Sequence, residues 1–257
     1  MRNFGFIITM VMILTFSESK GQQENFLGLS FGGAIPQGSF SQDNFSDSTN
    51  GYANTGFMFA FDAAWFPDDY LGIGATVTFA SNNPDKTKYM ADLEKSILDQ
   101  YPFLGGPLKD SINLDYGVWK YLNLFVGPNV TIPSGNFNFD FRLMGGVSFV
   151  WKPSQTIDIN YPEEGSFSRK SEDKAVPALG YSAGVGIRYA LKSNMVLRLT
   201  AEYANTKPTF EFIDSITYND DPDPEQDEQS FTVEYEKVAM PIKNIHVGIG
   251  IAYNFEL

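Results

Sequence analysis

A small set of charged side chains stands at isolated positions within stretches that are otherwise apolar or built from small residues. An ion that is removed from water needs a partner of opposite charge, because an unpaired ion at low dielectric is very costly. The mixture of acids and bases therefore predicts either a narrow ion path or a network of ion pairs that fills an interior, and we expect the network. The residues are Asp62, Asp140, Arg142, Arg188, Arg198, Glu202 and Glu256.

The residue types that most often carry catalysis are scarce. His246 is the only histidine and cysteine is absent, which excludes disulfides, thiolate metal sites and thiol nucleophiles. A lipid-modifying enzyme or a protease of this composition would need a histidine with a serine or carboxylate partner. We expect His246 to be an inward-facing hydrogen-bond donor, and we expect no enzyme activity, no cofactor and no metal site.

The overall composition narrows the class of protein. Lys and Arg number 18 against 31 Asp and Glu, a formal net charge of -13, so repulsion from phosphates disfavours nucleic acid as a partner. Aromatic residues make up 15% and charged residues 19%, with 23 glycines and a mean hydropathy of -0.19. This combination is typical of a β-barrel, because its apolar residues occupy every second position instead of continuous blocks.

Alternation predicts the elements that must position these residues. In residues 178–191, large apolar side chains such as Val185 alternate with Gly, Ser and Arg188, a period of two that indicates a strand. Residues 137–151 and 245–257 show the same period. Less regular patterns bring the total to about eight strands, an even number as closed antiparallel barrels require. The less regular strands are predicted at about 25–35, 55–66, 70–81, 118–132 and 195–205.

The connections between the predicted strands alternate between short and long. Outer-membrane barrels have this asymmetry, with tight periplasmic turns and long extracellular loops. The short turns span 67–69, 133–136 and 192–194, and the long connections span about 36–54, 82–116, 153–177 and 206–243.

Alternation alone also permits a soluble, lipocalin-like barrel with its apolar face inward. Such a barrel should carry many Lys, Glu and Gln on its outer face, whereas the polar face here is mostly Gly, Ser, Ala and Thr, which suit a narrow lumen. We therefore expect an all-β, eight-stranded antiparallel transmembrane β-barrel with the charged residues in its lumen. Aromatic girdles at the two membrane interfaces are predicted from Trp65, Tyr70, Phe137, Trp151, Tyr181, Tyr189, Tyr203 and Phe255.

The first residues have the pattern of an export signal. Arg2 precedes an apolar run from Phe4 to Phe16, and the small residues Ser19 and Gly21 fit a signal-peptidase site. The run is too short for a spanning helix, which needs about 20 residues. We expect residues 1–21 to be a cleaved signal peptide and residues 22–257 to form the barrel domain in the cell outer membrane.

Two of the long connections carry features of their own. Asn83 as N-cap and Pro84 at the first helical position predict a helix. Its apolar stripe either binds a partner or packs on the rest of the protein, and we expect packing. The fourth connection has an acidic run at 220–228 that either binds Ca²⁺ or is a solvated tip, and we expect the tip. The stripe consists of Tyr89, Met90, Leu93, Ile97 and Tyr101.

The strand motifs resemble a known family. The segments at 124–128, 139–147, 184–189 and 248–255 are similar to strands of the outer-membrane β-barrel family related to the OmpA transmembrane domain, especially its PorT-like branch. The resemblance implies a Gram-negative envelope protein that contacts outer-membrane lipid and lipopolysaccharide and meets the barrel-assembly machinery during insertion.

Three functions are consistent with these observations. The first is a non-enzymatic outer-membrane protein that is structural or that binds an extracellular ligand through its long loops. The second is a narrow, porin-like channel for passive diffusion. The third is an accessory role in protein secretion, which only the PorT-like resemblance implies.

Overall fold

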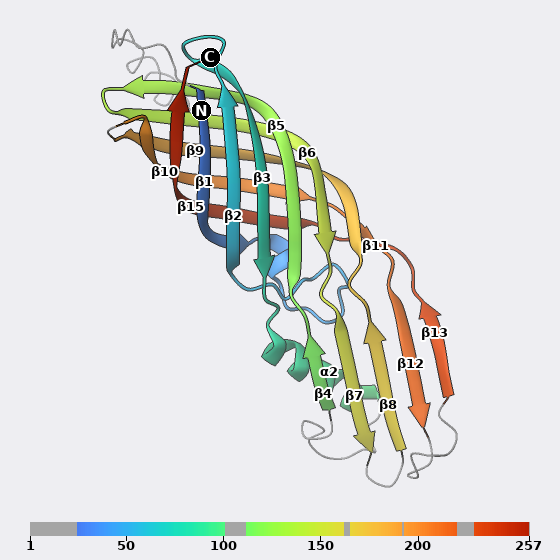
Figure 1. Ribbon diagram of the computed structural model, residues 1–257. Coiled ribbons are helices and arrows are strands. Elements are labelled where there is room, and N and C mark those ends of the chain that lie inside the picture. The colour runs from blue at the N-terminus through green and yellow to red at the C-terminus, as the bar shows by residue number, and fades with distance from the viewer. Residues whose placement is uncertain (1–24, 101–111, 162–164, 192, 220–228, 257) are drawn as a thin grey trace, which may run out of the picture.

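The computed structural model describes residues 25–100, 112–161, 165–191, 193–219 and 229–256 (Figure 1). The predicted signal peptide, Tyr101 and the acidic run at 220–228 lie outside the described residues. Within the described ranges the chain forms mostly β-strands, together with one α-helix and one short 3-10 helix, η1 (Gly38–Ser41).

Eight strands close into one antiparallel barrel. Around the barrel the order is β1-β15-β10-β9-β6-β5-β3-β2, and β2 pairs again with β1. Each strand lies close to a predicted one, so the predicted eight-stranded antiparallel barrel is confirmed. The strands are β1 (Asn25–Pro36), β2 (Gly56–Trp65), β3 (Leu71–Asn82), β5 (Trp119–Ser134), β6 (Phe137–Trp151), β9 (Ala175–Ala190), β10 (Met195–Thr206) and β15 (Ile242–Phe255).

The two faces of the barrel wall differ in kind, because successive side chains of a strand point to opposite sides. In β3 the large residues Ile73, Val77 and Phe79 are exposed, whereas Thr76 and Thr78 between them are buried. The other barrel strands repeat the pattern, with Phe31 59% exposed and Leu143 60% exposed on the outer wall. The large apolar residues thus face outward and the small and polar residues face the lumen, as predicted.

The short turns and the long connections lie at opposite ends of the barrel. Asn25 of β1 pairs with Phe255 of β15, so the start of the first strand and the end of the last lie together at the short-turn end. The turn between β5 and β6 contains Gly135 at a φ of +61°, a conformation that glycine adopts without steric cost. The predicted asymmetry of the connections is confirmed.

We expect loops throughout the long connections, and the structure differs from this expectation. They contain a five-stranded sheet of order β13-β12-β8-β7-β4 and a small pair, β11 with β14. We call the five-stranded sheet, with the helix that packs on it, the lobe; it extends from the end of the barrel opposite the short turns (Figure 1). Its strands are β4 (Ile112–Tyr116), β7 (Gln155–Tyr161), β8 (Gly165–Ser171), β12 (Ile213–Asn219) and β13 (Gln229–Glu234), and the pair is β11 (Thr209–Phe210) with β14 (Val238–Ala239).

The order of the lobe sheet repeats the order of five neighbouring barrel strands, β15-β10-β9-β6-β5. Each lobe strand therefore continues a barrel strand after a short interruption. Between β6 and β7 the interruption is residues 152–154 and contains Pro153, and Pro208 follows β10. Proline cannot donate a hydrogen bond to a sheet. The strands beyond these breaks are only five to seven residues long, which is why alternation did not single them out.

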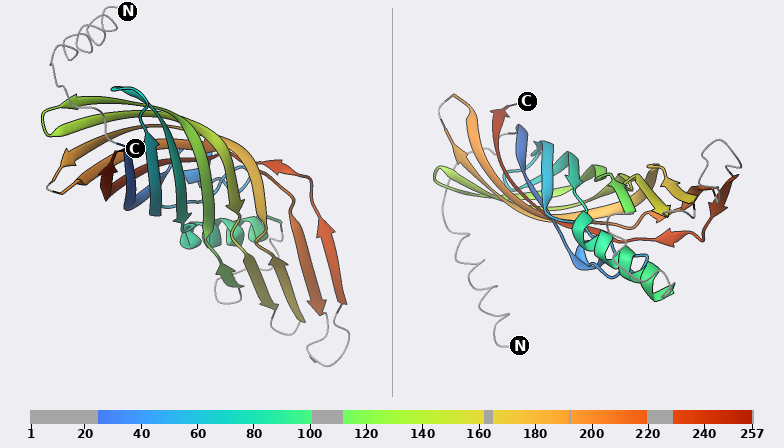
Figure 2. Two further views of the ribbon diagram at one scale, coloured as in Figure 1. Left: turned by 45° about the horizontal axis from the view of Figure 1, so that its top comes forward. Right: turned by 90° about the horizontal axis from the view of Figure 1, so that it is seen from below.

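The predicted helix is present as α2 (Lys86–Gln100), which lies along the lobe sheet (Figure 2). Its predicted start is wrong: Asp85 is the N-cap, because its Oδ1 accepts a hydrogen bond from the Lys88 amide at 3.1 Å. Pro84 instead forms a bridge with Ala53. Among the described residues, no helix is both long and apolar enough to cross a membrane.

The apolar stripe of α2 packs on the lobe sheet, as expected. Leu93 is buried against Ile112 of β4 and Ile157 and Ile159 of β7. Tyr89, Met90 and Ile97 are partly buried against the same cluster.

Candidate functional site

The charged residues predicted for the lumen come together inside the barrel. Asp62 lies on β2, Asp140 and Arg142 on β6, Arg188 on β9, and Arg198 and Glu202 on β10. All six are buried, and we call them the lumen network. Glu256 does not join them: it follows the end of β15 and is exposed, so its predicted place in the lumen is wrong.

The first group of the lumen network is centred on Asp62. Its two carboxylate oxygens bind different guanidinium groups, with Arg142 Nη1 at 2.5 Å from Oδ1 and Arg198 Nη1 at 2.9 Å from Oδ2. Arg142 also places Nη2 at 3.4 Å from Glu202 Oε2. Two acids and two bases thus neutralise one another, with Arg142 linking both acids.

The second group pairs Arg188 with Asp140 through two parallel contacts. Arg188 Nε lies 2.8 Å from Asp140 Oδ2, and Nη2 lies 3.0 Å from Oδ1. Thr131 donates a hydrogen bond of 2.7 Å to the same Oδ1. Such bidentate, charge-assisted contacts fix geometry as well as charge.

Apolar layers lie on both sides of the lumen network. Toward the short-turn end, the ring centroid of Phe26 lies 4.4 Å from Arg188 Cζ and 4.8 Å from Arg198 Cζ. Phe26 packs there with Phe66 and Val196. Toward the lobe, a larger buried cluster fills the mouth, consisting of Ala34, Phe40, Ala53, Met58, Ala60, Ala80, Trp119, Tyr121, Val150, Phe210, Met240 and Ile242.

Between this cluster and the lumen network, polar side chains fill the barrel interior and leave little empty volume. Ser148 donates to Asn123 Oδ1 at 2.8 Å, and the cavity between Tyr121, Ser148 and Asn244 has a volume of about 10 Å³. A space of that size holds at most one water molecule.

His246 lies on β15 inside the barrel and is buried. Its ring stacks on Tyr121, with 6.1 Å between centroids and 15° between planes. Neither ring nitrogen hydrogen-bonds to any part of the chain that the structure describes, so the prediction that His246 is a hydrogen-bond donor is wrong. The ring of Tyr121, which belongs to the buried apolar cluster at the barrel mouth, lies where we expected a polar partner.

The described ranges contain no cluster of side chains suited to bind a metal ion. No group of three or more His, Asp or Glu side chains there could hold an ion.

The residues predicted as aromatic girdles lie near the two ends of the barrel. At the short-turn end, Trp65 and Tyr70 are exposed, and the rings of Phe137 and Tyr189 lie 4.9 Å apart on neighbouring strands. Phe255 is half-buried at the same end. At the lobe end, Tyr181 is exposed and Trp151 and Tyr203 are half-buried.

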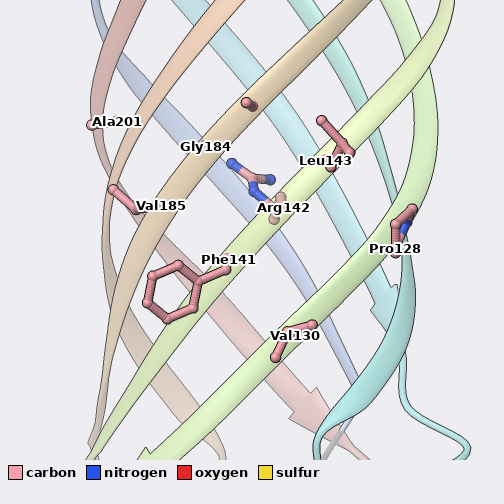
Figure 3. A pocket seen from close by; sticks show the side chains of 9 residues that line it. Pro128, Val130, Phe141, Arg142, Leu143, Gly184, Val185 and Ala201 are labelled. Atoms are coloured by element: carbon pink, nitrogen blue, oxygen red, sulfur yellow. The ribbon is translucent and has the colours of Figure 1, made fainter. Parts of the chain in front are cut away.

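One shallow depression interrupts the apolar outer wall (Figure 3). The pairing of β5 with β6 skips Gly127 and Pro128 while the register continues on both sides. A Cβ on Gly127 would lie 2.1 Å from the Leu143 carbonyl oxygen, so this close approach requires glycine. The depression measures about 480 Å³, and Arg142 lies between its outward-facing lining residues Phe141 and Leu143.

A second cavity, which the sequence did not predict, lies where the barrel strands give way to the lobe. We call it the rim cavity; its volume is about 310 Å³. All four long connections line it, and together they supply many aromatic rings. Its lining consists of Asn44, Phe45, Asp47, Ser48, Asn50, Tyr52, Tyr89, Tyr116, Trp119, Lys152, Pro153, Gln155, Arg169, Ser171, Phe212, Tyr235, Glu236, Val238 and Met240.

The aromatic residues of the rim cavity form a cluster around Tyr89. The ring centroid of Tyr89 lies 5.5 Å from Phe45, 5.3 Å from Tyr52 and 4.9 Å from Tyr116. Burial raises the pKa of the Tyr89 and Tyr116 hydroxyls above the usual range, so both are neutral at physiological pH. Tyr52 donates a hydrogen bond of 2.7 Å to Asp92 of α2, which ties the first connection to the helix.

Two basic side chains, Arg169 and Lys152, line the same cavity and differ in their ion pairing. Arg169 is paired with Asp214 at 2.6 Å. Lys152 is only 5% exposed; its Nζ donates to Ser171 Oγ at 2.7 Å and lies 4.5 Å from the Phe212 ring centroid. Lys152 makes no ion pair with any of the residues that the structure describes. Burial lowers the pKa of the Lys152 ammonium.

Rings such as Phe45, Phe212 and Tyr235 are the sequence signal for this cavity, because each stands in a long connection in which alternation predicts no strand. Loop aromatics without period-two neighbours do not predict a strand, but they do indicate packing or binding.

No protein-family model matches the chain, and no curated protein matches it. Solved outer-membrane proteins resemble it in structure. A major outer membrane protein of Thermus thermophilus is 13% identical with a TM-score of 0.45, covering 91% of this chain and all (100%) of that one. Neisserial surface protein A is 10% identical with a TM-score of 0.45, covering 92% and 100%. The outer membrane protease OmpT from Escherichia coli is 11% identical with a TM-score of 0.45, covering 94% and 100%. None of these similarities assigns a family or an activity to this chain.

Proposed function

We propose that this protein is a non-enzymatic integral outer-membrane β-barrel protein whose long connections form an extracellular binding lobe. The observation that carries the proposal is an apolar outer wall around a filled lumen. Large apolar side chains face outward on every barrel strand. They require a nonaqueous environment, because exposing so much apolar surface to water is unfavourable. A closed barrel is the form in which strands cross a bilayer, since it leaves no unpaired sheet edge.

The spacing of the outward aromatic residues supports insertion in a bilayer. Tyr181 and Tyr189 of β9 lie eight residues apart, or roughly 26 Å along the strand. At a tilt of about 40° this is roughly 20 Å along the membrane normal, near the ~25 Å apolar band of outer-membrane barrels. The short turns would then face the periplasm, and the lobe would face the outside. Lipid and lipopolysaccharide would contact the wall, and the barrel-assembly machinery would insert it.

The filled lumen argues against the channel alternative. An ion would have to pass the apolar layer around Phe26, the lumen network and the buried apolar cluster at the barrel mouth. Opening that path means separating buried ion pairs, and a buried charge without a partner costs several kcal/mol. The geometry thus supports a plug more than a pore.

The secretion alternative rests on the PorT-like resemblance alone. All the residues that carry the resemblance lie in β5, β6, β9 and β15 of the barrel, and none lies in the lobe. They support the architecture of the wall and contribute no argument about a secretion partner.

The absence of cysteine gives a direct test of the topology. We expect a cysteine introduced by Lys170→Cys, at an exposed position of the lobe strand β8, to react with a membrane-impermeant maleimide on intact cells. Asp68→Cys, in the exposed turn between β2 and β3, serves as the matched control and should react only after the outer membrane is permeabilised. Equal labelling of both on intact cells, or recovery of the protein in the soluble periplasm, would contradict the proposal.

Conductance tests the choice between plug and pore. We expect the purified protein to show no stable open state of porin size in planar lipid bilayers, because the lumen network spans the barrel interior. A steady conductance of porin size in the unmodified protein would restore the diffusion alternative.

A further inference from the structure

We propose that the rim cavity binds an acidic saccharide, with a sugar ring stacked on its aromatic side chains and the carboxylate or phosphate of the sugar bound by Lys152. This inference rests on the proposed function, because it places the cavity on the outer side of the membrane. It assigns a ligand class to the binding lobe.

The anionic part of the ligand is inferred from Lys152. Its ammonium is buried at the wall of the cavity, with one hydroxyl and one ring as neighbours and no carboxylate partner among the described side chains. Asp214 is the acid that attracts Lys152 electrostatically, but it is paired with Arg169 at 2.6 Å through Oδ2, and neither of its oxygens hydrogen-bonds to Lys152. A buried cation without a counterion is costly, and an anion from a ligand would compensate it through a charge-assisted hydrogen bond.

The ring part of the ligand is inferred from the aromatic lining. Several aromatic residues line this one cavity, among them Phe45, Tyr52, Tyr89, Tyr116, Trp119 and Tyr235. Their faces are apolar and carry a negative quadrupole, and they suit the C–H face of a pyranose. A free inorganic anion would leave these rings unused, and a purely apolar ligand would leave Lys152 without a partner.

The hydroxyl groups of a sugar also find partners there. Asn50 has a buried Oδ1 that accepts no hydrogen bond from the described residues, although its Nδ2 donates to the Asn44 carbonyl at 3.1 Å. An unpaired buried acceptor is costly unless a donor reaches it. Gln155, Ser48 and Glu236 add polar groups to the same lining.

The size of the cavity limits the ligand. A volume of about 310 Å³ is at the low end of small-molecule sites. It admits one or two sugar rings, either as a free saccharide or as part of a longer chain. Because the cavity would face outward, the saccharide could come from the cell's own lipopolysaccharide or from a soluble acidic polymer.

The primary experiment compares D-glucuronate with D-glucose on the purified full-length barrel in detergent micelles, by calorimetry and saturation-transfer NMR. We expect glucuronate to bind about tenfold more tightly, as a hydrogen bond to a charged group implies. Saturation of the protein's aromatic protons should transfer to the C–H protons of the sugar. Equal affinity for the two sugars, absence of binding, or absence of this transfer would overturn the proposal. So would full displacement of glucuronate by an equal concentration of inorganic phosphate.

Variants then locate the effect. Lys152→Met, which keeps the apolar stem, should abolish the preference for glucuronate, whereas Lys170→Met at an exposed position of β8 should retain it. Heat-modifiable migration on gels verifies that each variant is a folded barrel. A folded Lys152→Met variant with an unchanged preference would overturn the proposal, and the comparison of the two sugars on the unmodified protein decides it without any variant.

Competition distinguishes the two sources of saccharide. Displacement of glucuronate by deacylated lipopolysaccharide would identify the cell's own surface, and displacement by oligogalacturonate would identify a soluble polymer. Displacement by neither would overturn the assignment. The maleimide experiment is independent of these results, so failure to bind sugar and failure of the topology are distinguishable.

Discussion

At the scale of single residues, the lumen network depends on shared partners more than on isolated pairs. Asp62 binds two guanidinium groups, and Arg142 binds two carboxylates. Removing a member that links two others, such as Arg142, therefore leaves a buried charge without an ion-pair partner among the described residues. Glu202 illustrates this, because Arg142 is its one ion-pair partner among the described residues.

The first prediction follows from this sharing. Arg142→Met should destabilise the barrel by about 3–5 kcal/mol, the usual cost of leaving one member of a buried ion pair alone. The measurement is urea unfolding in lipid vesicles. As a control, Lys88→Met breaks the pair with Asp43, whose side chains are 60% and 49% exposed, and such surface pairs contribute about 0–1 kcal/mol. Similar losses in the two variants would show that the lumen is wet and well screened.

The sequence predicts which residues of the lumen network face inward, but it does not predict which of them form ion pairs. The period of two placed Asp140, Arg142 and Arg188 on the inner face, because that depends only on neighbours in the chain. The partners could not be predicted: Arg142 reaches Asp62 across 80 residues, and Arg198 reaches it across 136. Those meetings depend on strand order and on the stagger between strands, which alternation does not encode.

At the scale of elements, the barrel and the lobe have different supports. Each barrel strand pairs with two neighbours in a closed ring, whereas the lobe sheet has two edge strands, β13 and β4, and is covered in part by α2. The Leu93 cluster holds the helix against β4 and β7. The interruptions at 152–154 and elsewhere separate the two sheets. We therefore expect them to unfold as separate cooperative units.

Leu93→Ala tests this separation. The change should cost about 2–5 kcal/mol of local stability, the range for removing a buried leucine side chain. Hydrogen exchange should increase in β4 and β7 and stay unchanged in β5 and β6. Lys95→Ala, at an exposed position of the same helix, should leave all four strands as they are. Faster exchange throughout the barrel in Leu93→Ala would show that barrel and lobe form one unit.

The same contrast explains what could be predicted about the elements. The barrel strands are long and strictly two-sided, so their alternation stands out. The lobe strands β7 and β8 are only seven residues each, and β8 carries polar side chains on both faces, so few periods repeat. The helical spacing of the apolar stripe predicted α2. The predicted cap was Asn83, whereas Asp85 is the N-cap and Pro84 pairs with Ala53.

At the scale of the whole molecule, every functional proposal depends on which face of the wall meets lipid. The exposed outer residues argue for an inserted barrel, and the buried acids and bases argue for a sealed interior. A soluble barrel could keep neither feature, because its outer wall would aggregate. The depth of a residue in the bilayer should therefore control how much a charge at that position costs.

Val185 and Tyr189 of β9 test this dependence, since both face outward and Val185 lies midway between Tyr181 and Tyr189. Val185→Arg should cost roughly 2–4 kcal/mol, because it places a cation near the bilayer midplane. Tyr189→Arg, at the interface, should lose roughly 0–1 kcal/mol through its charge. Folding titrations of both variants into lipid vesicles measure the difference. Equal losses in the two variants, or no loss for Val185→Arg, would show that the apolar wall does not span the bilayer. Both positions face outward on one strand, so only an environment whose polarity changes with depth can make their energetic costs differ.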